Sequence, residues 1–198
     1  MSPCDGVSLV RIAERRTAYF KHQEFRQLMS AIRENWLRDL VLFAAATGMR
    51  QGEILSLRWE NVDLCRRIAH VECNSSFKPK GGKMRSVPLS DAAIGALGSR
   101  DSSDPSAHVF TLHGKPLMRR WVTTKLRRYI RALKLDRRLN FHSIRHSTAS
   151  WLAMEGISIY QISKILGHSD VKITQHYYAH LQPDELHDAV NKIKFTDR

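Results

Sequence analysis

Apolar residues recur at helical spacing through most of this chain of 198 residues. Phe25, Leu28 and Ile32 follow one another at steps of three and four, which places them on one face of a helix. A second apolar run, 37–45, leads to Gly48, a residue suited to a left-handed helix C-cap. This pattern predicts a chain built mainly of helices.

One interval in the first half of the chain is typical of strands instead. Residues 66–73 and 83–89 are expected to form two strands, and Gly81 and Gly82 between them suit a hairpin turn. Residues 98–108 have the composition of a surface loop. Further helices are expected near 122–133, 142–155, 159–166 and, behind a possible N-cap at Asp170, through Tyr177 and Tyr178, with Gly156 and Gly167 as C-caps. The predicted fold class is mainly α with a small antiparallel β-sheet, an α+β domain.

Positive charge is the strongest compositional signal. Lys and Arg number 32 against 19 Asp and Glu, a formal net charge of +13. Such an excess favours a polyanionic partner such as nucleic acid, although a surplus for solubility, a ribosome-adjacent protein or a membrane-surface protein would also show it. Between Lys115 and Arg138 ten residues are Lys or Arg and one is acidic, whereas an ordinary solvated face mixes signs. The candidate DNA-binding residues of this segment are Arg119, Arg120, Lys125, Arg127 and Arg128.

Several classes of protein are disfavoured by composition. No run of about 18 apolar residues exists, so no membrane-spanning helix is expected. The N-terminus has no apolar core of signal-peptide length, and three cysteines at irregular spacing do not form a disulfide framework. We therefore expect a cytoplasmic protein without membrane contact.

The stretch FHSIRHSTASW places polar rings and a guanidinium in what is otherwise a packed helix. His142 and His146 lie four apart and could be two metal ligands, but no third ligand or zincin HExxH spacing accompanies them. Arg145 has a better partner in Arg50, because two guanidinium forks can hold the non-bridging oxygens of one phosphodiester. Glu53 could pair with one arginine and fix its rotamer, although a simple Arg50–Glu53 helix salt bridge explains the spacing equally well.

Four sequence blocks then occur in a familiar order: TGMRQGEILSLRWENVDL, KPKGGKMRSVPL, HSIRHSTASWL and LGHSDVKITQHYYAHL. Together they closely resemble the catalytic domain of tyrosine recombinases, the phage integrase and Xer-type family, over roughly 20–185. The resemblance implies a catalytic domain at 20–182. It also implies that 1–19 is a linker from a preceding N-terminal DNA-binding domain, and that 183–198 is a tail that docks on a neighbouring protomer or in cis.

The resemblance also assigns roles to individual residues. Arg50 and Arg145 match the two phosphate-binding arginines, and His142 matches the histidine of the HxxR block. His168 matches the third-block histidine, which would hydrogen-bond a non-bridging oxygen. Lys80, preferred to Lys78 because the run KGGKxRxVPL starts there, matches the hairpin lysine that protonates the leaving oxygen.

Two adjacent tyrosines compete for the role of nucleophile. In the family the tyrosine follows the LGH histidine by nine residues and a threonine by three, which selects Tyr177. The YAHL string that is common in the family starts at Tyr178 instead. On a helix Tyr178 shares a stripe with Val171 and Thr174, which predicts that it packs against the core. Tyr177 is the preferred nucleophile, and the choice stays open on the sequence.

The resemblance implies a site-specific DNA recombinase. Its tyrosine would form a covalent bond to a DNA 3′ phosphate without a metal, cofactor or ATP, at a specific site in double-stranded DNA. The full-length protein would act as a homotetramer on DNA in the nucleoid, and this chain alone would be monomeric. A type IB topoisomerase with the same tyrosyl chemistry and a catalytically inactive DNA-binding module are the alternatives. The sequence identifies neither the target site nor the type of element that carries the gene.

Overall fold

A computed structural model describes residues 17–72, 84–98, 100, 102–168 and 170–178. Most of the expected linker at 1–19, the hairpin tract with Lys78 and Lys80, and the expected tail at 183–198 lie outside the described residues. Within the described part, no helix is long and apolar enough to cross a membrane.

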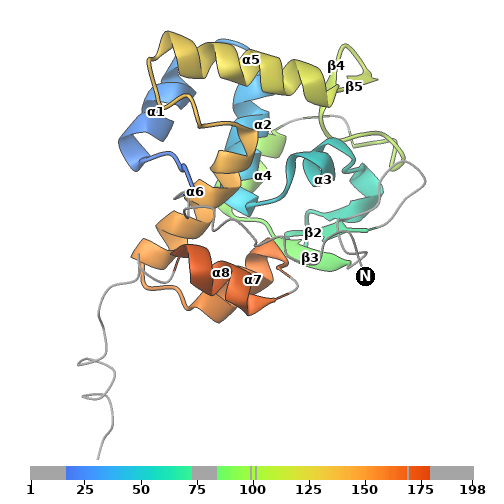
Figure 1. The fold of residues 1–198 in the computed structure, drawn as a ribbon. Helices are drawn as coiled ribbons and strands as arrows, with labels where there is room; N and C mark the ends of the chain where they lie inside the picture. The colour runs from blue at the N-terminus through green and yellow to red at the C-terminus, as the bar shows by residue number, and fades with distance from the viewer. Residues whose placement is uncertain (1–16, 73–83, 99, 101, 169, 179–198) are drawn as a thin grey trace, which may run out of the picture.

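Helices make up most of the described structure (Figure 1). They are α1 (His22–Ala31), α2 (Asn35–Thr47), α3 (Gln51–Leu55), the 3-10 turn η1 (Trp59–Asn61), α4 (Asp91–Leu97), α5 (Arg119–Ala132), α6 (Phe141–Met154), α7 (Ile159–Leu166) and α8 (Val171–Tyr178). The predicted fold class is confirmed. The short helix α4 was not predicted.

Two small antiparallel sheets complete the described part of the fold. The first has the order β1–β2–β3, with β1 at Val62–Asp63, β2 at Ile68–Val71 and β3 at Arg85–Pro88. Ile68 pairs with Pro88 and Val71 with Arg85, which confirms the two strands predicted at 66–73 and 83–89. The second sheet, β4 (Thr111–Leu112) with β5 (Lys115–Pro116), was not predicted.

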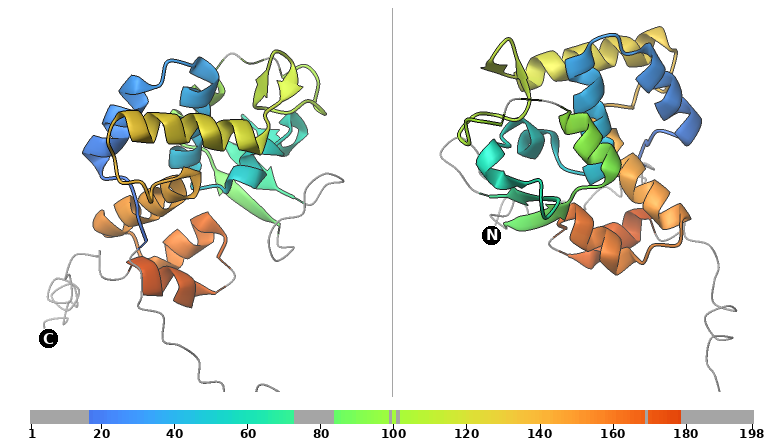
Figure 2. Two further views of the ribbon diagram at one scale, coloured as in Figure 1. Left: turned by 45° about the horizontal axis from the view of Figure 1, so that its top comes forward. Right: turned by 180° about the vertical axis from the view of Figure 1, so that it is seen from behind.

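The main core forms around α2. Its side chains Leu37, Leu40, Val41 and Phe43 have no exposed surface, because α4 and α6 pack against this helix. Seen from behind, α4 lies directly against α2 (Figure 2). The buried α2 therefore fixes the position at which the chain leaves it, at Gly48.

A second, smaller apolar cluster joins α6 to α7 and α8. It contains Ala149 and Ala153 of α6, Ile162 and Leu166 of α7, and Tyr178 of α8. In Figure 1 these two last helices lie at the opposite end of the molecule from α5, and the left view of Figure 2 agrees. The position of α8 thus depends on a few contacts, of which the Tyr178 side chain is one.

Two predicted glycine caps deliver side chains to the same region. Gly48 ends α2 with φ 63° and Gly167 ends α7 with φ 67°, both in the left-handed region that favours glycine. The chain turns at Gly48 into Arg50 and at Gly167 into His168. The predicted N-cap is also present, since Asp170 Oδ1 accepts the Lys172 backbone N–H at 2.8 Å.

Candidate active site

Arg50 lies at the start of α3, where a buried carboxylate holds it. Its backbone N–H donates to Glu53 Oε2 at 2.8 Å, and its Nη1 donates to Glu53 Oε1 at 3.0 Å. The Arg50 side chain keeps 26% of its surface exposed, whereas the Glu53 side chain keeps none. Because the carboxylate is buried and the guanidinium is partly open, this pair differs from a surface salt bridge.

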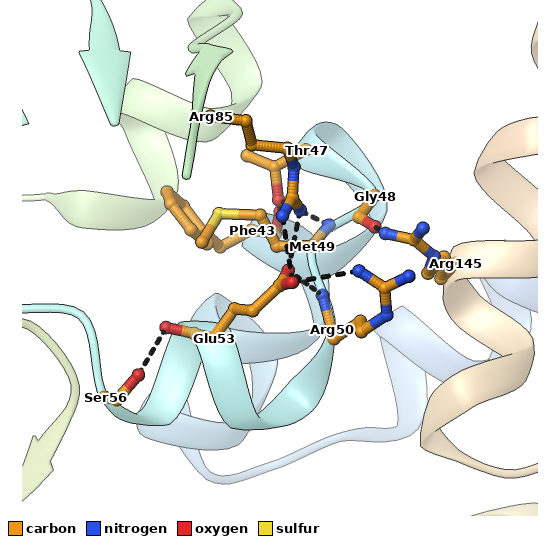
Figure 3. A network of polar contacts seen from close by, with 9 residues as sticks. All are labelled: Phe43, Thr47, Gly48, Met49, Arg50, Glu53, Ser56, Arg85 and Arg145. Atoms are coloured by element: carbon orange, nitrogen blue, oxygen red, sulfur yellow. Dashed lines mark hydrogen bonds and ion pairs between the residues drawn. The ribbon is translucent and has the colours of Figure 1, made fainter. Parts of the chain in front are cut away.

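A second arginine shares the same carboxylate. Arg85 on β3 donates from Nη1 to Glu53 Oε1 at 2.9 Å and from Nη2 to Oε2 at 2.7 Å (Figure 3). Burial raises the pKa of Glu53, but the hydrogen bonds and charges of Arg85 and Arg50 outweigh it and hold that pKa below its ordinary value. Glu53 is therefore ionised at neutral pH.

Arg145 enters the cluster from α6 and is almost completely buried, at 3% exposure. Its Nη1 donates to the Gly48 carbonyl oxygen at 2.8 Å, as Figure 3 shows, while Nη2 is buried and has no hydrogen-bond partner in the described structure. Burial and the neighbouring Arg50 lower the pKa of Arg145 to about 9, so it still carries its charge at neutral pH. This donor of Arg145 is therefore available to a ligand.

His168 follows the α7 cap and lies half-buried beside the arginines. Burial and the charges of Arg145, Arg50 and Arg85 lower its pKa to about 4, so the ring is neutral at pH 7. Its Nδ1 is 2.7 Å from Oγ1 of Thr174, a fully buried residue of α8. With Nδ1 engaged, Nε2 is the nitrogen that remains for a further contact.

Two histidines of α6 line the side of the cluster next to α8. His142 is exposed near the start of the helix, and its ring meets that of His146 edge to face at a centroid distance of 4.7 Å. His146 Nδ1 lies within hydrogen-bond distance of the Tyr178 hydroxyl. Burial and the neighbouring His142 lower the pKa of His146 to about 3, so this ring is neutral as well.

The two tyrosines of α8 occupy different environments. Tyr178 is 2% exposed, as the helical stripe predicted, and burial raises the pKa of its phenol. Tyr177 is 39% exposed, and its ring centroid lies 6.0 Å from that of His146. Tyr177 is therefore the more exposed of the two tyrosines, and its ring lies near that of His146.

The cluster has more positive charge than it neutralises. Arg50, Arg85 and Arg145 contribute three guanidinium charges, Glu53 contributes one carboxylate, and three positive with one negative leaves +2. Both His146 and His168 are neutral at pH 7. Since buried charges in proteins are normally paired, an excess of two positive charges indicates a site for an anion.

The basic helix α5 is tied to the beginning of α3. Gln51 Nε2 donates to the Arg119 carbonyl oxygen and to Thr123 Oγ1, each at 3.3 Å. Among the predicted DNA-binding residues, Arg119, Arg120, Arg127 and Arg128 are exposed. Lys125 is half-buried and forms an ion pair with Glu34 at 2.6 Å.

The structure brings together most of the residues singled out from the sequence. Arg50, His142, Arg145 and His168 lie in one region, with Tyr177 beside it, while Lys80 lies outside the described residues. Arg85 was missed, although it stands in one of the four blocks. The signal that identifies Arg85 is its ion pair with Glu53, and the two residues lie 32 positions apart in the sequence. Among the described residues, no group of three His, Cys, Asp or Glu side chains could hold a metal ion.

The sequence matches the model of the phage integrase family over residues 18–185, which is most of the chain. The helical fold and the cluster of arginines and histidines agree with a catalytic domain of this family. The chain belongs to the phage integrase family, and the resemblance to tyrosine recombinases is thereby confirmed.

Curated relatives of the chain are named as tyrosine recombinases. The chain is 31% identical over 161 residues to the tyrosine recombinase XerD of Lacticaseibacillus casei, covering 76% of this chain and 53% of that protein. It is 26% identical, over an alignment 231 residues long, to a XerC-like tyrosine recombinase of Caldanaerobacter subterraneus subsp. tengcongensis. This alignment covers 97% of this chain and 59% of the relative. The chain thus spans little more than half the length of these relatives.

Solved structures share the fold at lower identity. The Tn1549 transposon integrase in complex with a circular intermediate DNA superposes with a TM-score of 0.73 at 18% identity, covering 98% of this chain and 70% of that one. The catalytic domain of bacteriophage HP1 integrase superposes with a TM-score of 0.66 at 23% identity, covering 88% of this chain and 94% of that one. The described fold is therefore that of these integrases.

Proposed function

We propose that this chain is the catalytic domain of a site-specific DNA recombinase, which cleaves and rejoins strands through a phosphotyrosyl intermediate. The observation that carries the proposal is the unneutralised positive cluster of Arg50, Arg85 and Arg145 beside the exposed phenol of Tyr177. A DNA phosphodiester is an anion that fits such a cluster. Family membership and the DNA bound to the Tn1549 integrase support the same partner.

In the proposed reaction the Tyr177 oxygen attacks the phosphorus of one strand. A P–O bond to tyrosine forms while the bond to the 5′ oxygen breaks, leaving a 3′-phosphotyrosyl linkage. An ordinary phenol has a pKa of about 10, so the attack needs a proton acceptor and a positive field. His142 is the candidate acceptor, and Lys80 is the candidate donor of the proton to the leaving oxygen.

Arg50 and Arg145 would stabilise the charge that develops on the non-bridging oxygens. Arg145 Nη2 is a donor that the described protein leaves unsatisfied, and Arg50 keeps part of its fork exposed. His168, neutral and fixed through Nδ1 by Thr174, would donate its Nε2 proton to the same phosphate. Because the linkage preserves the phosphodiester bond energy, a 5′ hydroxyl from another strand can reverse the reaction without ATP.

The assembly that performs strand exchange is also part of the proposal. We expect the full-length protein to act as a homotetramer on DNA and this chain alone to be monomeric, with 183–198 as the docking tail. The relatives are longer than the region that they share with this chain, and the N-terminal DNA-binding domain expected from the sequence remains part of the proposal.

Covalent capture on DNA tests the proposed chemistry. The chain is incubated with a library of short duplexes of random sequence, each nicked on one strand so that the released end diffuses away. We expect a protein–DNA adduct that survives denaturing electrophoresis, and peptide mapping should place the nucleotide on Tyr177. Sequencing the captured duplexes would identify the preferred site.

Two matched substitutions assign the nucleophile. Tyr177→Phe should abolish the adduct, whereas Tyr178→Phe should still form it, because the two differ only in which hydroxyl is removed. Loss of the adduct in Tyr178→Phe alone would transfer the role to the neighbour. Failure of the wild-type chain to capture any duplex would overturn the proposed function.

A further inference from the structure

Arg85 reaches from the sheet to the first arginine of the site. It stands on β3 opposite Val71, and its side chain is only 12% exposed. Both of its terminal nitrogens donate to the Glu53 carboxylate, at 2.9 Å and 2.7 Å, which is the bidentate geometry that arginine favours. The edge of the Arg85 guanidinium formed by Nη1 and Nη2 is thus occupied by the Glu53 carboxylate.

Arg50 depends on the same carboxylate for its position. Glu53 Oε1 accepts from Nη1 of both Arg50 and Arg85, and Oε2 accepts from Arg85 Nη2 and from the Arg50 backbone N–H. Each carboxylate oxygen is therefore shared between the two arginines, as Figure 3 shows. Moving Arg85 would free one side of Glu53 and loosen the residue that holds Arg50.

The stem of Arg85 also passes over Gly167, the residue before His168. A Cβ atom at Gly167 would lie 2.3 Å from Arg85 Cδ, 2.5 Å from Nε and 3.0 Å from Cζ. Arg85 cannot easily move away, because both of its terminal nitrogens are held by the buried Glu53 carboxylate. Because Gly167 has no side chain, the Arg85 side chain can pass over it and reach Glu53.

We propose that Arg85 is a positioning residue for DNA cleavage, which fixes Arg50 through Glu53 and His168 through its seat on Gly167. One side chain then sets the spacing between two phosphate-contacting groups that come from α3 and from the end of α7. This inference rests on the proposed function for its catalytic consequence. The Arg85–Gly167 contact itself can be tested without DNA.

Cleavage kinetics test the catalytic part, on the nicked duplex that the wild-type chain captures most efficiently from the library. Arg85→Lys keeps the charge but loses the fork, and we expect the adduct to form roughly tenfold more slowly at saturating DNA, with little change in apparent affinity. Arg85→Met removes the charge as well and should slow it by about 100-fold, the scale expected for misplaced catalytic groups. The matched control is Arg66, 82% exposed, for which both substitutions should leave the rate unchanged.

The pH profile separates positioning from general destabilisation. Arg85 helps to hold the pKa of Glu53 down against burial, so Arg85→Met should raise that pKa. Protonated Glu53 no longer pairs with Arg50, and the acidic limb of the cleavage rate should therefore move toward neutral pH. An unchanged rate and an unchanged profile in Arg85→Met, with active wild type, would overturn the inference while leaving the proposed function intact.

A double-mutant cycle tests the contact without DNA. Gly167→Ala should lower the melting temperature more than Gly114→Ala, because Gly114 has a similar φ of 73° but nothing within 4 Å of an added Cβ. In an Arg85→Ala background the excess should disappear, leaving only the backbone strain. Additive effects of the two substitutions on the melting temperature would overturn the proposed contact between Arg85 and Gly167. If the two substitutions are coupled but the wild-type chain never forms an adduct, the proposed function is wrong. The Arg85–Gly167 contact then stands, but the proposed role of Arg85 in DNA cleavage does not.

Discussion

Tyr177 and Tyr178 are adjacent, but the helix gives their hydroxyls different chemistry. The Tyr178 phenol is buried, which raises its pKa, and it lies within hydrogen-bond distance of the neutral ring of His146. The Tyr177 phenol remains exposed beside the same histidine. The protein thus keeps one phenol as an anchor for α8 and leaves the other accessible.

The anchor should be visible in stability measurements. Tyr178→Phe removes the hydroxyl and leaves His146 Nδ1 without its partner in a largely buried position. We expect a loss of about 1–3 kcal/mol in the free energy of unfolding, the usual cost of such an orphaned group. Tyr177→Phe, a change at an exposed site, should stay within about 0.5 kcal/mol. Urea titrations of the two variants make the comparison, and equal losses would argue against the anchor.

Residue spacing predicted some of these placements and not others. The burial of Tyr178 follows from helical periodicity, because Thr174 lies four residues earlier on the same stripe and is also buried. Arg85 could not be found in this way. Its partners, Glu53 and Gly167, lie 32 and 82 residues away and become neighbours only when β3, α3 and the end of α7 pack together.

The elements at the C-terminal end of the described fold depend on uncharged histidines. His146 of α6 contacts Tyr178 of α8, and His168 after α7 contacts Thr174 of α8. Burial, reinforced by neighbouring positive groups, lowers the pKa of both histidines, to about 3 and about 4. Protonating either ring would add a cation to a region that already has excess positive charge.

Stability should therefore fall as the solution becomes acidic. Both histidines have folded-state pKa values below the ordinary value of about 6.5, so between these values the unfolded chain binds more protons. Their contribution is fully present above pH 6.5 and is lost progressively below it; half-buried His108, whose pKa burial also lowers, adds to this trend. Glu53 acts in a lower window, because its own pKa lies below 4.5.

Melting temperatures measured from pH 7.5 down to pH 5 check this expectation. The wild-type value should decrease steadily below pH 6.5, and His146→Asn combined with His168→Asn should flatten the decrease, since asparagine keeps a hydrogen-bonding group but does not titrate. A slope that is unchanged in the double variant would assign the pH dependence to other groups.

Helices with long periodic patterns were predictable, as were the paired strands β2 and β3, whereas α4 and the second sheet were not. The runs that became α2, α5 and α6 each span at least 13 residues, enough for several turns of apolar spacing. Helix α4 has seven residues, and β4 and β5 have two each. A usable signal for α4 was present in Ser90, whose hydroxyl accepts the Ala93 backbone N–H at 3.3 Å as an N-cap.

At the scale of the whole molecule, the net charge of +13 suits a protein that tracks a polyanion. The exposed arginines of α5 belong to a helix that is hydrogen-bonded to Gln51, the residue next to Arg50. Binding that is dominated by phosphate contacts releases counterions, so the affinity for DNA should fall steeply as salt rises. A nearly constant affinity between low and moderate salt would contradict this view of the surface.

The same salt dependence shows which individual arginines contact phosphates. Arg127 and Arg128 are exposed on α5, so replacing either with alanine should reduce the slope of log affinity against log salt by about one unit. Lys125 lies on the same helix but is paired with Glu34 at 2.6 Å, so it neutralises a carboxylate rather than a phosphate. Lys125→Ala should therefore change the slope less than either arginine substitution. Fluorescence anisotropy with one labelled duplex over a salt series compares the three variants, and an equal change for Lys125→Ala would mean that DNA binding breaks the Glu34 pair.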